Sequence, residues 1–548
     1  MTHPGATGFT ALLLSLGAAA AHGQAVDTVS RIDSLFGRVS TTGPGCAVGI
    51  SREGAPDLLR AYGLASLEYR IPNSPATVFH AASIAKQFTA ASIMMLASSG
   101  KLSLDDDVRR YVPELPDYGT RITLEHLLHH TSGLRDEGAL LWLAGGRDDD
   151  PTEEDDLLAM IFRQRRLNFS PGTQHLYSNT GYTLLALVVR RVSGSPLKEF
   201  ARDRLFVPFG MTGTQFVDNR FAVIPGRATG YRMLIGGEWG HTPYVADAYG
   251  AGGILMTVGD LLRWYQQLPG DSVLWPAALR RARLVNGDSV PYSMGLEFGS
   301  VQRARYLGHG GNAMGESAYA MRFVERALAV AVLCNGREID AFTLARQVAG
   351  LFLPPAPVAR PVETAPVVAV SAIQLRRLAG LYYNAATIAT RTVQEKDGRL
   401  YWVRGGPGTP LDAVAPNRFR FPPGQPAELL FPDSVPGQPR EMQVLSGGTV
   451  TSYRRATPFA STTRLGDYAG RYRSDEVDVT LTVTPVDSGI VISTPGAWRF
   501  RAAPLFRDAF AIPEAAVFEF VRRGKGGGVS GLVVDMARSR RMAFRRVD

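Results

Sequence analysis

A proline-rich stretch divides this chain of 548 residues into two parts whose sequence patterns differ. The prolines lie in LPPAPVARPVETAPVVAV, residues 353–370. Proline lacks a backbone N–H and has a fixed φ, so this stretch can continue neither a helix nor a central strand. We therefore predict a linker over 353–370 that follows a domain over 26–352.

Beyond the linker the sequence predicts antiparallel β-structure, because short alternating strands are interrupted by Gly, Pro and Asp. This part also repeats itself. LRRLAGLYY (375–383) and LGDYAGRYR (465–473) share a Leu and the motif Ala-Gly-x-Tyr, and the stretches SYRRA and AFRRV end the two copies. We predict two sibling β-barrel domains, 371–458 and 459–548, and assign no chemistry to either because neither sequence contains a cluster of His, Cys or carboxylate residues.

The first residues predict a secretory leader. An apolar run from Phe9 to Ala21 is followed by small residues, which is typical of a signal peptide. The residues before this run include His3 but no Lys or Arg, so a buried N-terminal helix is the alternative. We expect residues 1–25 to be removed and the mature protein to be exported to the periplasm or the extracellular space.

Composition and charge argue against several classes of protein. With 45% hydrophobic and 20% charged residues, the chain is typical of a globular protein. Its net charge of +9 comes from scattered Arg residues, so we expect no nucleic-acid partner. No later apolar run is long enough to span a bilayer, so we expect no integral membrane segment after cleavage. The oligomeric state is left open.

One acidic run, RDDDPTEEDD (147–156), interrupts the mixed charge pattern. Its Pro and Thr suit a turn that leads into a helix, whose N-terminus favours acidic residues. We interpret the run as a solvated surface, with selection of a cationic substrate as the alternative.

A Ser and a Lys stand near the start of an apolar stretch. VFHAASIAKQFTAASIMMLASSG, residues 78–100, predicts one long buried helix with Ser83 and Lys86 in its first turn. Positions i and i+3 are neighbours on a helix, and both burial and the helix dipole lower the pKa of a lysine. A partly neutral Lys86 could then take the proton of Ser83 and make it a nucleophile. The alternative is an N-cap serine followed by a lysine that reaches solvent.

A second motif brings a phenol and an amide. FSPGTQHLYSNTGYTLLALVVRRVSG places Tyr177 and Asn179 in a turn before an apolar helix that ends at Gly194. The spacing allows the phenol to reach the Ser–Lys pair and the amide to contact both the lysine and a substrate carbonyl. The alternative is an ordinary turn Asn beside a half-buried Tyr.

A third motif lies in YLGHGGNAMGESAYAMRF. The run His309-Gly310-Gly311 predicts a strand edge without bulky side chains, against which a substrate backbone can lie. The backbone amides of Asn312 and Ser83 could then point at a developing oxyanion. The alternative is a glycine bulge beside a surface His.

The ordered set S-x-x-K at 83, Y-x-N at 177 and H-x-G at 309 resembles the serine beta-lactamase and penicillin-binding-protein superfamily. The likeness is greatest to its class C-like branch of esterases and D-aminopeptidases, and ITLEHLLHHTSGL and YGAGGILMTVGDLLRWYQQL share it. The layout also resembles bacterial D-aminopeptidase, whose two C-terminal domains are lipocalin-like barrels. The resemblance implies an α+β fold, in which an antiparallel sheet flanked by helices lies beside an all-helical lobe, with the site in the crevice between them.

The resemblance also implies a role for each residue. Ser83 is the expected nucleophile, Lys86 its base and Tyr177 a second acid/base. Asn179 is expected to orient the substrate, and the backbone amides of Ser83 and Asn312 to form the oxyanion hole. The implied reaction is acyl transfer through a covalent acyl-serine on a small-molecule or short peptide substrate, without a metal or organic cofactor.

His309 departs from many members of the superfamily, which carry a Lys that binds the carboxylate of a beta-lactam or a D-Ala-D-Ala terminus. A His is only partly charged near neutral pH, which weakens carboxylate recognition. We therefore rank hydrolysis of small amides, peptides or esters above DD-carboxypeptidase and beta-lactamase activity. A catalytically silent envelope binding protein is the alternative from another class, although the intact Ser83, Lys86 and Tyr177 count against it.

The cysteines and the histidine cluster give weaker signals. Cys46 and Cys334 are too few for a disulfide framework. The superfamily fold places the first strand beside the last, so one disulfide and two buried thiols both stay open. His126, His129 and His130 have helical spacing, but there is no HExxH pattern and the resemblance implies a structural helix end, so we predict no metal site.

Overall fold

The computed structural model describes residues 28–548 apart from 38, 40, 148–149, 246–248, 356–365, 404–407, 423–424, 426, 433–438, 447–448, 460–463, 495, 497 and 525–526. The expected leader at 1–25 and much of the expected linker at 353–370 lie outside these described residues. In the part of the chain that is described, no helix is both long and apolar enough to cross a membrane.

The described chain forms two compact units. The first unit contains the described residues of 1–133, 148–158 and 169–357, and the second contains those of 134–147, 159–168 and 358–548. The division therefore does not follow the predicted linker alone, because two short segments that precede it in the sequence belong to the second unit.

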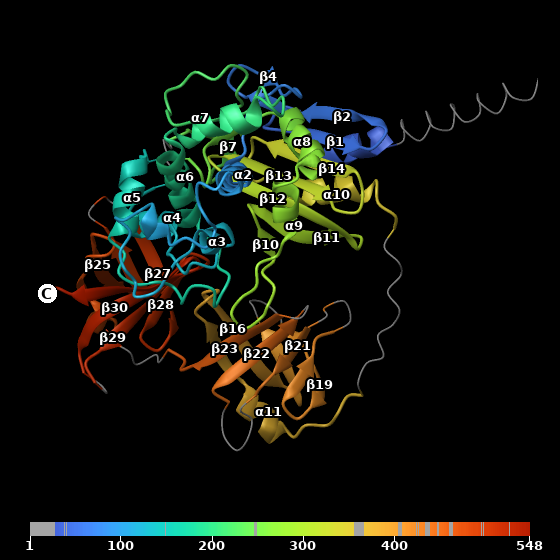
Figure 1. Ribbon diagram of the computed structural model, residues 1–548. Helices are drawn as coiled ribbons and strands as arrows, with labels where there is room; N and C mark the ends of the chain where they lie inside the picture. Colours follow the sequence, from blue (N-terminus) through green and yellow to red (C-terminus); the bar gives the residue numbers. More distant parts are fainter. Residues whose placement is uncertain are drawn as a thin grey trace, which may run out of the picture. The chain divides into compact units, whose positions relative to one another are not determined.

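A seven-stranded antiparallel sheet runs through the first unit, with the strand order β10-β11-β12-β13-β14-β1-β2 (Figure 1). Its strands are β1 (Cys46–Arg52), β2 (Ala55–Tyr62), β10 (Tyr292–Ser293), β11 (Leu296–Val301), β12 (Ala304–Ala313), β13 (Glu316–Phe323) and β14 (Leu328–Cys334). β1 pairs with β14, and Cys46 lies opposite Cys334. These two cysteines form a disulfide, which decides between the possibilities that the sequence left open.

Helices and short strands complete the first unit. The helices are α2 (Ala85–Ser98), α3 (Leu124–Leu128), α5 (Glu154–Phe162), α6 (Asn179–Ser193), α7 (Leu197–Ala201), α8 (Val258–Gln267), α9 (Leu274–Leu279) and α10 (Ala341–Gly350), with the shorter turns η1 (Ala82–Ile84), η2 (Val108–Arg110), η3 (Arg202–Phe206) and η4 (Leu268–Gly270). The short strands are β3 (Leu64–Ser66), β4 (Ile71–Pro72), β5 (Phe79–His80), β6 (Gln215–Phe216), β7 (Gly230–Met233), β8 (Trp239–Thr242) and β9 (Ile254–Met256). α5 crosses the boundary between the units, since its last residues belong to the second.

Helices cover both faces of the sheet. Val48 of β1 packs in one core with Ala345 and Val348 of α10. The next residue, Gly49, faces Leu262 of α8, whose side chain would lie 2.6 Å from an added Cβ. Because successive side chains of a strand point to opposite faces, α8 and α10 lie on opposite sides of the sheet. The predicted α+β arrangement is confirmed.

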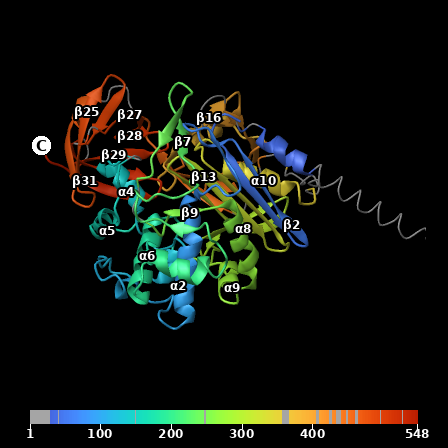
Figure 2. The same ribbon diagram turned by 90° about the horizontal axis from the view of Figure 1, so that it is seen from above.

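The helical part of the first unit is built around α2 and α6, which pack side by side (Figure 2). The prediction of one helix over 78–100 is wrong at its start, because α2 begins at Ala85. Phe79 and His80 pair with β9 instead, and the His80 N–H donates to the side chain of Glu316 at 2.8 Å. These contacts keep the chain extended until η1, where Ser83 lies.

Two antiparallel β-structures make up most of the second unit. The first barrel, a nine-stranded sheet, has the order β18-β17-β16-β15-β23-β22-β21-β20-β19. Its end strands β18 and β19 are separated in sequence only by Leu411, so the sheet is nearly closed. Its elements are α11 (Ala372–Leu378), β15 (Gly380–Asn384), β16 (Ala389–Lys396), β17 (Arg399–Val403), β18 (Thr409–Pro410), β19 (Asp412–Ala415), β20 (Arg418–Arg420), β21 (Ala427–Leu430), β22 (Glu441–Ser446) and β23 (Thr449–Ala456).

The second barrel is closed and has eight strands in chain order. Its elements are η5 (Leu465–Tyr468), β24 (Gly470–Ser474), β25 (Val479–Val486), β26 (Gly489–Ser493), β27 (Arg499–Phe506), β28 (Ala509–Ile512), β29 (Ala516–Arg522), β30 (Val529–Met536) and β31 (Ser539–Arg546). The prediction of two antiparallel barrels is confirmed, with one closed and one nearly closed. The likeness to lipocalins stays a prediction.

The sequence repeat forms the same local structure in both barrels. Tyr382 and Tyr472 each donate a hydroxyl hydrogen to a carbonyl of the helical turn before their strand, at 2.7 and 2.9 Å. Arg455 and Arg546 each donate to the carbonyl of the Ala in the Ala-Gly-x-Tyr motif, at 2.6 Å in both copies. The second Arg of SYRRA and of AFRRV therefore ties the last strand of each barrel to the turn before its first strand.

Two segments from before the linker complete the second barrel. Leu140 and Leu143 of α4 (Glu137–Ala144), together with Met160 of α5, are buried in the same core as barrel side chains such as Ile490. The place of 134–147 and 159–168 in the second unit agrees with this shared core, because burial of these apolar side chains among barrel residues is favourable.

Candidate active site

Ser83 lies in η1, directly before α2. The preceding Ala82 has a φ of 46°, in the left-handed region that non-glycine residues rarely adopt. Gly311 of β12 lies against this turn, since a Cβ there would be 2.1 Å from the carbonyl oxygen of Ala81. Only glycine permits this approach, so Gly311 brings the strand that carries Asn312 to the turn that carries Ser83.

Lys86 is fully buried, and its Nζ lies 3.0 Å from Ser83 Oγ. Nζ also donates to Asn179 Oδ1 at 2.9 Å and to the carbonyl oxygen of Ala251 at 2.6 Å. A neutral amine has two N–H groups and one lone pair. The amide and the carbonyl can therefore accept both hydrogens while the lone pair faces the Ser83 hydroxyl, which is the geometry of a base.

Tyr177 reaches the same place from the turn before α6. The centre of its ring lies 4.8 Å from Lys86 Nζ, 4.3 Å from the ring of His130 and 6.0 Å from the ring of His309. Asn179 is the first residue of α6. The structure thus brings together the three sequence motifs, while the chemical role of each residue stays a prediction.

His309 is buried, in contrast to the surface His of the alternative interpretation. Its Nε2 lies 2.9 Å from the hydroxyl of Tyr292, and its Nδ1 lies 2.6 Å from the carbonyl oxygen of Gly310. Burial raises the pKa of Tyr292 well above its usual value, so the phenol is protonated and can donate a hydrogen bond to Nε2. Burial lowers the pKa of His309 to about 3, so the ring is neutral at pH 7, and since the Gly310 carbonyl can only accept, the ring carries its hydrogen on Nδ1.

One side of β12 is unpaired beside the site, within the strands that the structure describes. The strand pairs with β13 as far as Ala313, but its pairing with β11 ends at Gly308. The stretch His309–Ala313 can therefore pair with an extended ligand on that side. The side chain of Asn312 is exposed, so its expected contribution to an oxyanion hole comes from its backbone N–H.

Sequence reasoning missed His130 as a residue of this site. Its Nδ1 accepts a hydrogen bond from the Ser178 N–H at 3.2 Å, and its ring packs against Tyr177, Tyr182 and Tyr292. Burial lowers its pKa well below the usual value, so the imidazole is neutral. The stretch HHTSG was the available signal, and it was interpreted only as the end of a helix.

Two further contributors were not predicted as site residues. Tyr292 holds His309 through its hydroxyl, and Ala251 acts through a backbone carbonyl. Both are distant in sequence from the residues they contact, so only the folded chain identifies them.

The remaining members of the histidine cluster lie in structural positions. His126 forms a capping box with Thr123 at the start of α3, and His129 is buried just after the end of that helix. Across the residues that are described, no group of three or more His, Cys, Asp and Glu could hold a metal ion.

The described part of the acidic run leads into α5, whose first turn contains three acidic residues. Glu154 pairs with Arg190 at 2.7 Å, and Glu153 with Arg220 at 3.6 Å. These contacts support the interpretation of the run as a surface turn and helix start.

Comparison with known proteins agrees with this geometry. The Beta-lactamase family model matches residues 32–351. Penicillin-binding protein 4* of Bacillus subtilis is 30% identical over 297 residues, which are 51% of this chain and 65% of that protein. A D-aminopeptidase of Gluconobacter oxydans is 28% identical over 305 residues, which are 54% of this chain and 56% of that protein. The chain therefore spans between half and two thirds of the length of these relatives.

A solved structure shows the same fold. The D-amino acid amidase from Ochrobactrum anthropi SV3, complexed with L-phenylalanine amide, covers 60% of this chain and 98% of its own chain, with a TM-score of 0.52. The two sequences are 22% identical, so this likeness concerns the fold alone.

Proposed function

Because the chain belongs to the Beta-lactamase family, we propose that it is a serine hydrolase that cleaves small amides or peptides through an acyl-serine intermediate. The relatives named as D-aminopeptidase and penicillin-binding protein support this class of reaction. The observation that carries the proposal is the position of Lys86 Nζ, 3.0 Å from Ser83 Oγ, with two other acceptors for its hydrogens.

Acylation begins when Ser83 gives its hydroxyl proton to the neutral amine of Lys86 and Oγ bonds to the substrate carbonyl carbon. The carbonyl oxygen becomes negatively charged, and the backbone N–H groups of Ser83 and Asn312 stabilise it. Ser83 lies at the start of a helical segment, where N–H groups have no acceptor within the helix. Asn179 and the Ala251 carbonyl stabilise the ammonium that forms on Lys86.

Collapse of the intermediate breaks the carbon–nitrogen bond, and the leaving amine needs a proton. Tyr177 delivers that proton and regains one from the Lys86 ammonium, 4.8 Å from its ring centre. Deacylation reverses these steps with water as the nucleophile. Water loses a proton to the same pair, its oxygen bonds to the acyl carbon, and Ser83 Oγ leaves with a proton.

The neutral state of His309 supports a substrate without a carboxylate at this position. A lysine there would attract the carboxylate of a beta-lactam or a D-Ala-D-Ala peptide, whereas a neutral imidazole supplies no charge. We therefore place amides and esters of amino acids, as in D-aminopeptidases and esterases, ahead of DD-carboxypeptidase or beta-lactamase substrates.

Export is part of the proposal. The disulfide between Cys46 and Cys334 supports it, because disulfides persist mainly in oxidising compartments. Fractionation of cells that produce the full chain tests it, since recovery of the reduced protein in the cytosol alone would contradict export.

A substrate panel tests the proposed activity. The purified protein should hydrolyse D-alanine p-nitroanilide or p-nitrophenyl acetate faster than nitrocefin or a D-Ala-D-Ala peptide. Ser83→Ala should lower kcat by about 1,000-fold or more, as loss of a nucleophile does. Full activity in Ser83→Ala would exclude Ser83 as the nucleophile. Failure of a fluorophosphonate to modify Ser83 in the folded protein would favour a silent binding protein.

A further inference from the structure

Glu316 carries a buried carboxyl group that the proposed mechanism does not use. It is the first residue of β13, where it lies opposite Ala313 of β12. Its Oε2 accepts a hydrogen bond from the backbone N–H of His80 at 2.8 Å. His80 lies three positions before Ser83, so the carboxyl group is bonded to the chain segment that leads into the proposed nucleophile.

The carboxyl group satisfies a backbone donor that the neighbouring strand does not. In an antiparallel pair, successive N–H groups point alternately toward the partner strand and away from it. The N–H of Ala81 points toward β9 and donates to the carbonyl of Ile254 at 3.0 Å. The N–H of His80, one residue earlier, points away from β9 and meets Glu316. A buried N–H needs an acceptor, and at this position a side chain supplies it.

Glu316 and Gly311 contact the same turn from one hairpin. Opposite residues of an antiparallel pair share a face, as do residues two apart in a strand, so Glu316, Ala313 and Gly311 lie on one face of the β12–β13 hairpin. Gly311 permits the close approach of the Ala81 carbonyl, and Glu316 binds the N–H of His80 just before it. The hairpin therefore fixes the turn by a steric contact and by a hydrogen bond.

This turn requires support because its backbone is strained. The φ of 46° at Ala82 is a conformation that persists only where the surrounding structure fixes it. In the proposed reaction the N–H of the next residue, Ser83, stabilises the oxyanion. Relaxation of Ala82 would therefore displace both the Oγ and the N–H of Ser83.

The groups around Glu316 favour its protonated form at neutral pH. Burial raises the pKa of Glu316 to about 8, although the charge of Arg227 opposes this rise. Burial lowers the pKa of His80 to about 3, so that ring is neutral. The guanidinium of Arg227 lies 4.5 Å from the centre of the Tyr244 ring, which also packs edge-on against the ring of His80. A carboxylate at Glu316 would be a buried charge beside the turn, which favours its displacement toward water.

We propose that protonated Glu316 is a positioning residue that holds the turn before Ser83 in the conformation that forms the oxyanion hole. The oxyanion hole in this statement rests on the proposed function, whereas the attachment of the turn to Glu316 does not. Glu316 acts through the backbone of His80 and does not itself touch the substrate.

Two variants of Glu316 test this role through turnover. Glu316→Met keeps a side chain of similar length and removes both oxygens. We expect it to lower kcat for D-alanine p-nitroanilide about 100-fold and to change KM less than about threefold, because a displaced turn weakens contacts made in the transition state. Glu316→Gln should stay within about threefold of the wild-type kcat at pH 7, because its amide oxygen can accept the same hydrogen bond. Full activity in Glu316→Met, or equal losses in both variants, would overturn the proposal.

The pH profile tests the protonated state, and it does not need Glu316→Met to fold. Glu316→Gln cannot ionise, so any fall of kcat that it shares with the wild type comes from other groups. With the pKa of Glu316 at about 8, the ratio of wild-type to Glu316→Gln kcat should fall about tenfold from pH 7 to pH 9. A constant ratio would overturn the requirement for a protonated carboxyl group.

Hydrogen exchange in residues 79–84, measured by mass spectrometry, is a readout without turnover. Glu316→Met should raise exchange there at pH 7, and Glu316→Gln should not. At pH 9, after correction for intrinsic rates, the wild type should exchange faster in this segment than Glu316→Gln. If exchange is unchanged in Glu316→Met, or equal in the wild type and Glu316→Gln at pH 9, the positioning role is overturned. Absence of hydrolysis by the wild type would by itself refute only the proposed function.

Asp535→Leu is the matched control for loss of stability. Asp535 is also a buried carboxyl residue that accepts a backbone N–H, that of Arg541 at 2.7 Å, but it belongs to the second barrel. Its replacement should leave kcat and the exchange of residues 79–84 unchanged. A rise in exchange there equal to that in Glu316→Met would indicate general destabilisation and overturn the proposal.

Discussion

The two barrels share a sequence repeat and a local structure, but they differ in what fills them. The core of the first barrel is made of residues that follow the linker, from Leu375 to Tyr453. That barrel also keeps a cavity of about 280 Å³, lined in part by Val368 and Phe419. The core of the second barrel instead includes Leu140 and its neighbours from before the linker. Two copies of one fold can thus differ in whether a distant chain segment is needed to complete them.

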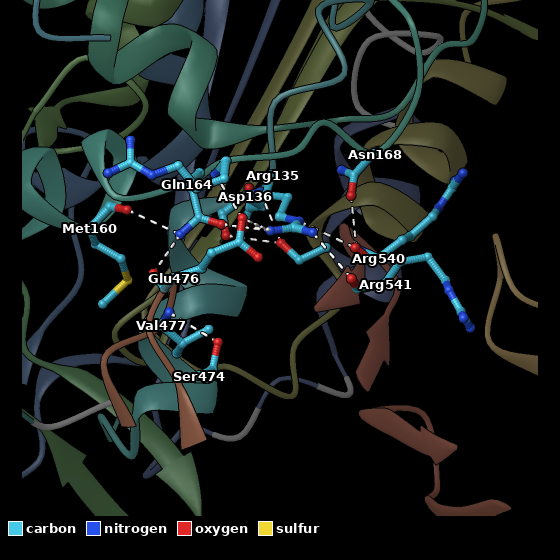
Figure 3. A network of polar contacts seen from close by, with 12 residues as sticks. Arg135, Asp136, Met160, Gln164, Asn168, Ser474, Glu476, Val477, Arg540 and Arg541 are labelled. Carbon is cyan, nitrogen blue, oxygen red and sulfur yellow. Dashed lines mark hydrogen bonds and ion pairs between the residues drawn. The ribbon is translucent and has the colours of Figure 1, made fainter. Parts of the chain in front are cut away.

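The largest expected difference between the two barrels is in the stability that is lost when an arginine is replaced, and Arg135 of the second unit should show the larger loss. Arg135→Met removes a buried cation. It leaves Glu476 and the backbone carbonyls of Arg540 and Arg541 without this partner (Figure 3). We expect the free energy of unfolding to fall by about 3–5 kcal/mol, measured by chemical denaturation. Arg399→Met in the first barrel removes a half-exposed ion pair with Asp412 and should cost less than about 1 kcal/mol. If both variants lowered the free energy of unfolding equally, this expected difference between the barrels would be wrong.

A matched pair of core truncations sharpens the comparison. Leu140 and Leu429 are both fully buried, so Leu140→Ala and Leu429→Ala should each cost about 2–5 kcal/mol. Hydrogen exchange should then separate them. Leu140→Ala should raise exchange in strands of the second barrel, and Leu429→Ala in strands of the first. If Leu140→Ala left the second barrel fully protected, the shared core would not be part of its stability.

The repeated arginines should behave alike. Arg455→Met and Arg546→Met each remove the hydrogen bond to the motif Ala while keeping an apolar side chain over the neighbouring Tyr ring. We expect each variant to lower the free energy of unfolding by about 2 kcal/mol, in denaturation experiments on the full chain. If only one of the two variants lowered the free energy of unfolding, the two copies of the repeat would differ in the stability that this arginine contributes, as well as in packing.

The smallest expected effect is a pH dependence that comes from a buried carboxyl group of the second barrel. Burial raises the pKa of Asp535, so the folded state keeps this proton at pH values where the unfolded state has lost it. The contribution of Asp535 to the free energy of unfolding therefore falls as the pH rises above the usual pKa of a carboxyl group. Asp535→Asn, which does not titrate, should gain stability relative to the wild type over that rise.

Asp548 provides a control of opposite sign in the same barrel. Hydrogen bonds from the Arg471 N–H lower its pKa, so its contribution is present at neutral pH and is lost as the pH falls. Asp548→Asn should lose stability relative to the wild type as the pH rises from the acid range. Denaturation midpoints at a series of pH values measure both variants, and equal signs would contradict the assignment of Asp535.

The sequence was a good guide where chemistry depends on local spacing. Ser83 and Lys86 are three positions apart, so a helical turn is enough to bring them together. The start of that helix was predicted too early, because the pairing of Phe79 with β9 is a contact between distant residues. His130 was interpreted only as a helix end, since its packing against Tyr177 appears only in the folded chain.

The sequence by itself determined the ordered motifs, the barrel repeat and the class of fold, because each depends on periodicity or on residues close together in the chain. Only the tertiary structure decided that Cys46 and Cys334 are bonded, that His309 is buried and neutral, and that Leu140 and Asn168 belong with the second barrel. The physical reason is that burial and long-range pairing depend on which distant surfaces meet. An apolar helix such as α4 has the same pattern whichever core receives it.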